Sequence, residues 1–334
     1  MSYATNVPDF KLMLGDKDLT PKVRPRLISL TLTDKRAGEA DQLEIELDDS
    51  DGGLALPRLG ATLTLQLGWK AGSEVELGLI NKGSFKVDSV AHAGAPDKVT
   101  ISASAADFNS QIRTRREKSW RNTTIGAVVA DVAARNKLTP RCAAALAALP
   151  VKALAQSRES DLALLRRLGR EHDAVATVKA GALVFAPIGA GTTATGAAIP
   201  GATIVRRQGD KHNFSMEKKE ESEGVSAAYH DRKAAKTKVV HAGKPDKAKR
   251  LARTYHTESA AKRAARSEHG RQQRAGAKFS FELALGRADL YPERKTRVQG
   301  FKPEIDATPW LIVEVVHTLG QGGYTTSLQM ERAA

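Results

Sequence analysis

The sequence has 334 residues, which is long enough for two or three domains with separate hydrophobic cores. Its formal net charge is +14 and its pI is about 9.8, so a polyanionic partner has to be considered. Its one cysteine, Cys142, excludes an intramolecular disulfide, and no apolar run reaches the roughly 20 residues of a bilayer-spanning helix. Because the first ten residues also lack the pattern of a signal peptide, we expect a chain that is made in the cytosol and does not insert into membranes.

The first part of the chain has the periodicity of β-strands. In residues 41–49, Leu43, Ile45 and Leu47 alternate with acidic residues, and residues 60–69 repeat the pattern with three leucines. A hairpin follows at residues 85–104. Strands that are separated by turns and show no helical period indicate a sandwich or barrel. We therefore predict a first tube-like β-barrel domain in residues 1–112.

The pattern changes to mixed helix and strand in residues 113–205, where we predict an inserted α/β domain. Residues 122–138 place apolar side chains at helical spacing, with Asn122 or Thr123 as the expected N-cap. A second helix is expected at 157–172, capped by Ser160 or Ser157. A hairpin at 174–187 and a flexible Gly/Ala/Thr loop at 188–202 complete this region.

From about residue 203 the β pattern returns, and we predict a second tube-like β-barrel domain in residues 206–334. Strands are expected near 203–207, 224–230 and 236–241, followed by a basic helix over about 246–274 that Thr257 can cap. The chain then closes with three strand patterns, at residues 278–285, 296–301 and the hairpin 310–329. The fold class expected overall is mainly β with an inserted α+β domain.

The final hairpin repeats the earlier one. Residues 310–329 overlay residues 85–104 without a gap, so that His317 falls on His92 at an offset of 225 residues (317 − 92 = 225). The strands that precede the two hairpins also correspond in order and in apolar pattern. A divergent internal duplication explains these three matches, although one similar hairpin by itself can arise by chance.

Enzymatic signatures are absent from the sequence. Gly189, Gly191 and Gly196 are not followed by the Lys-Ser/Thr of a phosphate-binding loop, and they indicate a flexible connector. No His-Glu-x-x-His or Gly-x-Ser-x-Gly motif occurs, and the histidines lack metal-ligand spacing. We expect His92 and His317 to share a structural role, such as a hydrogen bond to the turn backbone.

The densest group of carboxylates lies in residues 216–224, and it is the one place where a glycosidase pair could be sought. Lysines interrupt it, so a solvated face is the better interpretation of Glu217, Glu220, Glu221 and Glu223. We therefore predict no catalytic residue, no metal site and no cofactor.

The basic segment 244–275 carries ten Lys/Arg and three Asp/Glu, a net +7 (10 − 3 = 7) that is half of the whole excess. One interpretation is a solvent-facing helix that packs on a sheet through its alanines, and the other is a positive surface for nucleic acid or an acidic protein. Tyr255 is its one aromatic residue, which argues against stacking on single-stranded bases. The candidate lumen or interface residues are Lys247, Lys249, Arg250, Arg253, Lys262, Arg263, Arg266, Arg271 and Arg274.

Two stretches resemble the phage late control D family. Residues 156–187 contain the segment Gln-x-x-Glu-Ser-Asp-Leu-x-x-Leu-x-x-Leu, which resembles that of the family, and the short hairpin after it. Residues 286–331 are similar to its closing pattern, which ends in Trp-x-Ile-x-x-Val-x-His and Gly-Tyr-Thr-Thr. The likeness spans nearly the whole chain from about residue 20.

This resemblance implies a baseplate hub of a contractile phage tail or a tail-like particle such as an R-type bacteriocin. The family is similar to the N-terminal hub part of VgrG spike proteins, carries two tube-like barrels per chain and forms trimers. A homotrimer with six similar barrels would adapt a sixfold tail tube to a threefold central spike. The implied partners are the tail tube protein, the spike, other baseplate proteins and a tape-measure protein or DNA in the channel.

No spike or lysozyme-like module follows Ala334, so we expect a separate chain to carry out puncture and wall cleavage. Two other functions stay open on the sequence alone. The charge favours a nucleic-acid-binding protein, and the company that hubs keep suggests a peptidoglycan-cleaving tail enzyme.

Overall fold

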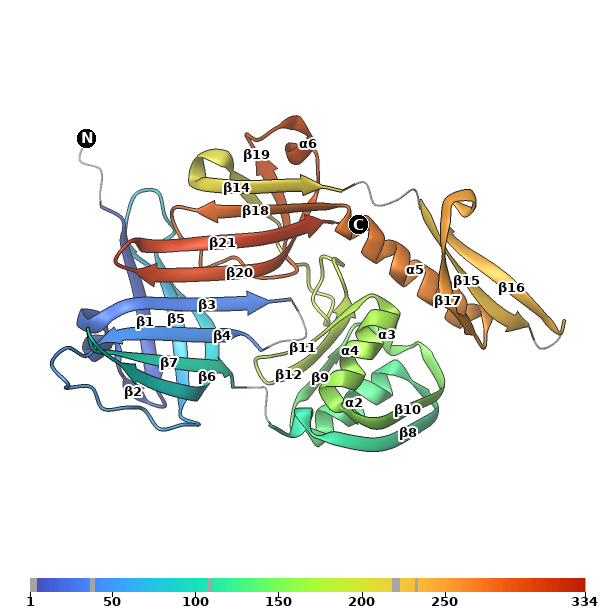
Figure 1. Ribbon diagram of the computed structural model, residues 1–334, viewed down its shortest axis with the longest axis horizontal. Coiled ribbons are helices and arrows are strands. Elements are labelled where there is room, and N and C mark those ends of the chain that lie inside the picture. The colour runs from blue at the N-terminus through green and yellow to red at the C-terminus, as the bar shows by residue number, and fades with distance from the viewer. Residues whose placement is uncertain (1–4, 37–39, 107–109, 218–222, 232–233, 334) are drawn as a thin grey trace.

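One large, mostly antiparallel sheet links the two ends of the chain (Figure 1). The computed structural model describes residues 5–36, 40–106, 110–217, 223–231 and 234–333. The acidic cluster expected at residues 216–224 therefore lies partly outside the described residues, including Glu220 and Glu221.

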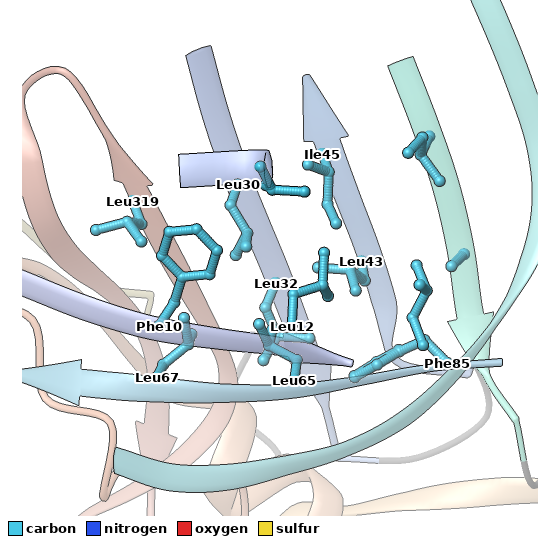
Figure 2. Close-up of a cluster of buried hydrophobic side chains, with 14 of the residues drawn as sticks. Phe10, Leu12, Leu30, Leu32, Leu43, Ile45, Leu65, Leu67, Phe85 and Leu319 are labelled. Carbon is cyan, nitrogen blue, oxygen red and sulfur yellow. The ribbon is translucent and has the colours of Figure 1, made fainter. Parts of the chain in front are cut away.

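The N-terminal half of the large sheet folds around its own core. Its elements are β1 (Val7–Leu14), β2 (Lys17–Asp18), α1 (Thr20–Val23), η1 (Arg24–Arg26), β3 (Leu27–Lys35), β4 (Gln42–Asp48), β5 (Thr62–Ala71), β6 (Gly78–Ala93) and β7 (Lys98–Ala105). The alternation that predicted the strands turns Leu43, Ile45 and Leu47 inward, where each is buried. Figure 2 shows Leu43 and Ile45 in one cluster with Phe10, Leu12 and Leu65 of the facing strands.

The C-terminal half of the sheet has a second core built around Phe279, Phe281 and Trp310. Its elements are β13 (Ala202–Val205), η3 (Arg206–Gln208), β14 (Gly209–Met216), β18 (Ala277–Leu283), β19 (Lys295–Gln299), α6 (Pro303–Asp306), β20 (Trp310–Gly320) and β21 (Gly323–Arg332). β13 pairs with β19, so this half of the sheet begins at Ala202, a little before the boundary expected at residues 205–206.

The two halves follow the same pairing path. In the first half neighbouring strands run β3-β4-β7-β6-β5-β1, and in the second half they run β14-β18-β21-β20-β19-β13. One pairing differs in direction, because β1 is antiparallel to β5 whereas β13 is parallel to β19. The halves join where β20 also pairs with β3.

Between the two halves the chain forms a compact α+β unit with a separate core. It contains η2 (Ser110–Arg113), β8 (Arg115–Thr124), α2 (Ile125–Arg135), β9 (Thr139–Cys142), α3 (Ala144–Ala147), β10 (Pro150–Ser160), α4 (Asp161–His172), β11 (Ala174–Lys179) and β12 (Ala182–Pro187). Ser160 caps α4 as predicted, since its hydroxyl accepts a hydrogen bond from the Ala163 amide at 3.1 Å.

The predicted cap of the first helix was wrong. Thr124, not Asn122 or Thr123, accepts the hydrogen bond from the Ala127 amide, at 3.3 Å. The helix begins at Ile125, so Thr124, the last residue of β8, flanks its first turn, whereas Thr123 lies one residue too early. The two-stranded sheet of β8 and β10 was not expected, because its strands carry mostly charged and small side chains instead of an apolar alternation.

A small three-stranded sheet with one helix projects at the end of the molecule opposite β1–β7 (Figure 1). It consists of β15 (Gly224–Asp231), β16 (Lys236–Gly243), η4 (Pro245–Lys247), β17 (Ala248–Tyr255) and α5 (Glu258–Ala275). The expected helix over 246–274 is therefore wrong in its first part. Residues 248–255 form a strand because Leu251 and Tyr255 pack onto the core under α5, a tertiary contact that local propensity does not reveal.

Candidate functional site

The junction of the two barrel-like halves is an antiparallel strand pair. β20 runs along β3 from the pair Glu314–Lys35 to the pair Gly320–Ser29, with His317 opposite Leu32. Leu30, Leu32 and Leu319 are buried along it, so apolar contact accompanies the ladder of backbone hydrogen bonds. Within one chain, the two halves are thus joined by antiparallel pairing of β3 with β20.

His317 is fully buried at this junction. Its Nδ1 lies 3.0 Å from both the Thr326 hydroxyl and the Tyr324 hydroxyl. Burial, and secondly the charge of Lys82, holds the pKa of His317 well below its usual value, so the ring is neutral. The shared role expected for the two histidines was wrong, because His92 is 44% exposed and its Nε2 lies 3.5 Å from Asp49.

Further hydrogen bonds cross from the first half to the second. The Trp69 indole donates to the carbonyl of Gly286 at 2.8 Å, and the Lys82 ammonium donates to the carbonyl of Ala288 at 2.7 Å. Burial lowers the pKa of Lys82 to about 8. These donors come from β5 and β6, so two strands of the first half hold the segment that precedes β19.

A network of ion pairs joins the first half, the second half and the inserted unit. Arg36, which follows β3, lies 2.5 Å from both Glu293 and Glu331. Arg274 of α5 pairs with Glu331 at 3.2 Å and with Asp173, the residue that ends α4. Most of these side chains are shielded from solvent, so loss of one member would leave a buried charge uncompensated.

A second buried cluster docks the inserted unit on the first half. The ammonium of Lys179 lies 2.6 Å from Asp34 and also contacts Asp41. Burial, and then the Asp34 charge, raises the pKa of Asp41 to about 6. Burial opposes the charge of Lys179, but the two carboxylates outweigh it and raise the Lys179 pKa.

A groove of about 700 Å³ lies beside these clusters. Its wall includes the Gly/Ala/Thr loop, which the Gly189 amide ties down by donating to Glu293 at 2.7 Å. The groove is lined mainly by apolar atoms from β11, β12, this loop and the segment Tyr291–Glu293.

The most distinctive segment of the sequence builds a buried polar cluster. Asp161, at the start of α4, accepts hydrogen bonds from Gln156 at 2.9 Å and from Asn136 at 2.8 Å. Arg135 lies 3.2 Å from the same carboxylate. The Gln-x-x-Glu-Ser-Asp pattern of residues 156–161 therefore fixes α4 against β10 and α2. The pattern could be recognised in the sequence, but this structural role could not be predicted from it.

The candidate basic residues are divided over several surfaces. Arg274 is buried, with 4% of its surface exposed, and Arg263 is half-buried. The exposed members are Lys247, Lys249, Arg250, Arg253, Lys262, Arg266 and Arg271. Arg274 therefore cannot serve as a lumen or interface residue, because its ion pairs hold it inside the protein.

Several exposed members of the set are also paired. Lys249 and Arg271 contact Glu268 at 3.5 and 2.5 Å, and Lys262 contacts Glu258 at 2.6 Å. Such local pairs reduce the net positive charge that a polyanion would meet.

The helix α5 is covered on two sides. Ala261 and Ala265 pack on the small sheet, as the alanine stripe predicted. On another side, Ser267 and Arg271 donate to the carbonyl of Arg170 in α4, at 2.6 and 2.9 Å. Arg271 is thereby held at the contact between α5 and α4.

Nothing in the geometry of the described ranges suggests a metal centre, since no three His, Cys, Asp or Glu side chains there gather at ligating distance. Within the same ranges, every helix is too short or too polar to cross a bilayer.

Comparisons with known proteins agree with this architecture. The sequence pattern of the phage tail baseplate hub (GPD) family matches residues 39–323. A probable baseplate hub protein of Escherichia phage 186 is 41% identical over 365 residues, which cover 97% of this chain and 92% of that protein. The corresponding protein of Escherichia phage P2 is 40% identical and covers 98% and 94% of the two chains.

Solved structures show the same fold at low sequence identity. The 43 kDa tail protein of prophage MuSo2 from Shewanella oneidensis has a TM-score of 0.72 at 12% identity and covers 98% of each chain. An E. coli component of the type VI secretion system has a TM-score of 0.58 at 13% identity, covering 92% of this chain and 74% of that one.

Proposed function

The chain belongs to the phage tail baseplate hub family, and from this premise we propose that three copies form a ring that adapts a sixfold tail tube to a threefold spike. A hub of this family has its place in the baseplate of a virion or tail-like particle. A ring binds partners of two symmetries best when one of its faces repeats six times and the other three times. Two similar barrels in one chain supply such a ring from three molecules.

The observation that carries this proposal is the matched pairing path of the two halves. A register shift interrupts the β6–β7 ladder between Val87 and Ser89, and an equivalent shift interrupts the β20–β21 ladder between Ile312 and Glu314. Both shifts lie at the same offset of 225 residues (312 − 87 = 225; 314 − 89 = 225). A β-bulge is a specific local feature, so its recurrence at one position favours an internal duplication.

The first strands of the two hairpins correspond at an offset of 225 residues, but their second strands correspond at an offset two residues larger. Phe85 pairs with Ala105, whereas the equivalent Trp310 pairs with Arg332. The second hairpin is thus two residues longer from Trp310 to Arg332 than the first is from Phe85 to Ala105 (332 − 310 = 22; 105 − 85 = 20), and the overlay without a gap holds for the first strand alone. Divergence at a turn leaves the paired core unchanged, as expected for duplicated barrels.

We further propose that the inserted unit, residues 113–201, meets neighbouring baseplate proteins, and that the hub itself carries out no catalysis. The first part is motivated by its separate core and by its position at the side of the large sheet (Figure 1). The second part is motivated by the sequence, which lacks every catalytic motif considered. Wall-cleavage assays on the purified chain should give no release of peptidoglycan fragments above a buffer control.

Native mass spectrometry tests the ring directly. The chain has a mass of 35.8 kDa, and the chain co-expressed with the tail's spike protein should give a complex with three hub copies. A hub that stays monomeric with the spike, and that is also absent from purified tails, would contradict the proposed function. Tight, salt-dependent binding of the monomer to duplex DNA would favour the nucleic-acid alternative.

A further inference from the structure

β6, the first strand of the earlier hairpin, has a free edge over part of its length. β6 pairs with β5 up to the pair Lys86–Thr62, and beyond that point it pairs with β7 alone, up to Ala93. Within the described residues no strand lies on the other side of Ser89–Ala93, and four of these five side chains are exposed. Open backbone groups of this kind are a template for another strand.

The first strand of the second half has a free edge as well. β14 pairs with β18 and, among the described strands, with no other. Met216 near its end is 61% exposed, although methionine is usually buried, and Phe214 is half-buried beside the second core. Neither β14 nor the free part of β6 contains a proline that would blunt the edge.

The pair of β3 with β20, in which each strand covers the edge of the other, is the closed junction. Strand pairings relate each free edge to one of its two strands. Val90 pairs with Ile101, and Val315 pairs with Leu328, so β6 corresponds to β20 and β7 to β21. One strand further, Ala103 pairs with Leu43 and Met330 pairs with Phe279, so β4 corresponds to β18.

The next pairing relates β14, the strand with the second free edge, to β3. Leu43 pairs with Leu32, and Phe279 pairs with Phe214, so β3 corresponds to β14 and Leu32 to Phe214. The closed junction of β3 with β20 therefore has a counterpart in the pair of β14 with β6. Inside one chain these two strands lie at separate places in the sheet, so their contact has to come from a second copy.

We propose that β14 of one copy adds antiparallel to the free edge of β6 in the next copy, with Phe214 opposite His92. This interface rests on the proposed ring and specifies its contact. The register copied from His317–Leu32 also sets Met216 opposite Val90 and Ser215 opposite Ala91. The exposed Met216 then gains the half-buried Val90 as an apolar neighbour.

The interface is heterologous, because each copy offers one β14 and one β6. Such contacts build either an open filament or a closed ring, according to the rotation between copies. In a ring of three copies, three junctions within chains would alternate with three between chains. All six junctions would use equivalent strands, β3 with β20 inside each chain and β14 with β6 between chains.

Disulfide trapping tests the register. The variant Ala91→Cys/Ser215→Cys, on a Cys142→Ser background, should give covalently linked dimers and trimers on mild oxidation of assembled tails. Directly opposite residues of an antiparallel pair have Cα atoms roughly 4.5–5.5 Å apart, which a disulfide can bridge. The pair Val316→Cys/Thr33→Cys copies the same geometry inside one chain and serves as the positive control.

The register control is Ala91→Cys/Met216→Cys, in which a slip of one residue turns the two side chains to opposite faces. It should give at least about tenfold less cross-linked product. Tails that contain three hubs but give no linkage between residues 91 and 215, while the positive control is oxidised, would overturn this interface and leave the proposed function intact. Tails from which the hub is absent would overturn both.

Discussion

The two equivalent histidines show how the same strand behaves with and without a neighbour. His317 is fully buried, where β3 covers β20, whereas His92 is 44% exposed on the uncovered edge of β6. Their strands, β6 and β20, have a bulge at the equivalent position, and each pairs with the second strand of its own hairpin. The difference therefore comes from what lies beside each strand, and it is the difference expected if one copy contains one complete junction and the two open edges of the proposed second one.

The largest expected effect concerns the ion pairs at the end of the closed junction. Arg36→Met should lower the free energy of unfolding by about 3–5 kcal/mol, because it leaves Glu293 and Glu331 shielded from water with one fewer positive partner. Chemical denaturation would measure this change. The control Arg250→Met removes an exposed charge on β17 and should leave the midpoint where it is. Equal effects of the two substitutions would contradict the network.

A matched pair of alanine substitutions compares the two histidines themselves. His317→Ala should cost about 2–4 kcal/mol, because it opens a cavity and removes the shared partner of Tyr324 and Thr326. His92→Ala should leave the stability of the isolated chain unchanged. Thermal unfolding of both variants under one buffer condition gives the comparison, and a costly His92→Ala would argue that its edge is already covered in the monomer.

The pH dependence should carry a contribution from His317. The unfolded histidine gains a proton near its ordinary pKa of 6.5, whereas the folded one, with a lowered pKa, stays neutral to lower pH. Stability from this group is therefore complete above pH 6.5 and is lost as the pH falls toward the folded pKa. Between pH 7.5 and 5.5 the loss should be about 1.4 kcal/mol, and His317→Gln should remove that part of the slope. Parallel slopes of the two proteins would refute the buried neutral ring.

The smallest effect on stability, and a large one on assembly, is expected at the open edge. Met216→Glu changes an exposed side chain, so the isolated chain should unfold as before. In the ring it would bring a carboxylate against Val90 and should weaken association at least about tenfold. Val239→Glu, at an exposed apolar site on β16, is the control that should assemble normally. The amount of hub retained in purified tails is the readout.

Most strands of the large sheet could be predicted because their apolar alternation is regular. Leu43, Ile45 and Leu47 face the core as their spacing indicated, and so do Phe279 and Phe281. The strands β8 and β10 could not be predicted, since their pairing, not their hydrophobicity, makes them strands. β17 could not be predicted either, because its basic sequence by itself favours a helix and the packing of Leu251 and Tyr255 under α5 is a tertiary contact.

The site was harder to predict than the fold. The nine basic residues drew attention through their number, but the charge count does not show that Arg274 lies inside an ion-pair network or that Lys249 contacts Glu268. The repeated hairpin was visible in the sequence, whereas the free edges of β6 and β14 appear only when strand neighbours are known. Edge exposure is a property of the sheet and leaves no signature in a single strand.

An image reconstruction of the assembled tail at the level of the hub tests the proposed ring of three chains and six units. We expect six barrel-like units related by approximately sixfold rotation, with β3–β20 contacts inside chains alternating with β14–β6 contacts between chains. A hub whose two halves occupy unrelated positions, or whose copies touch through other strands, would contradict it.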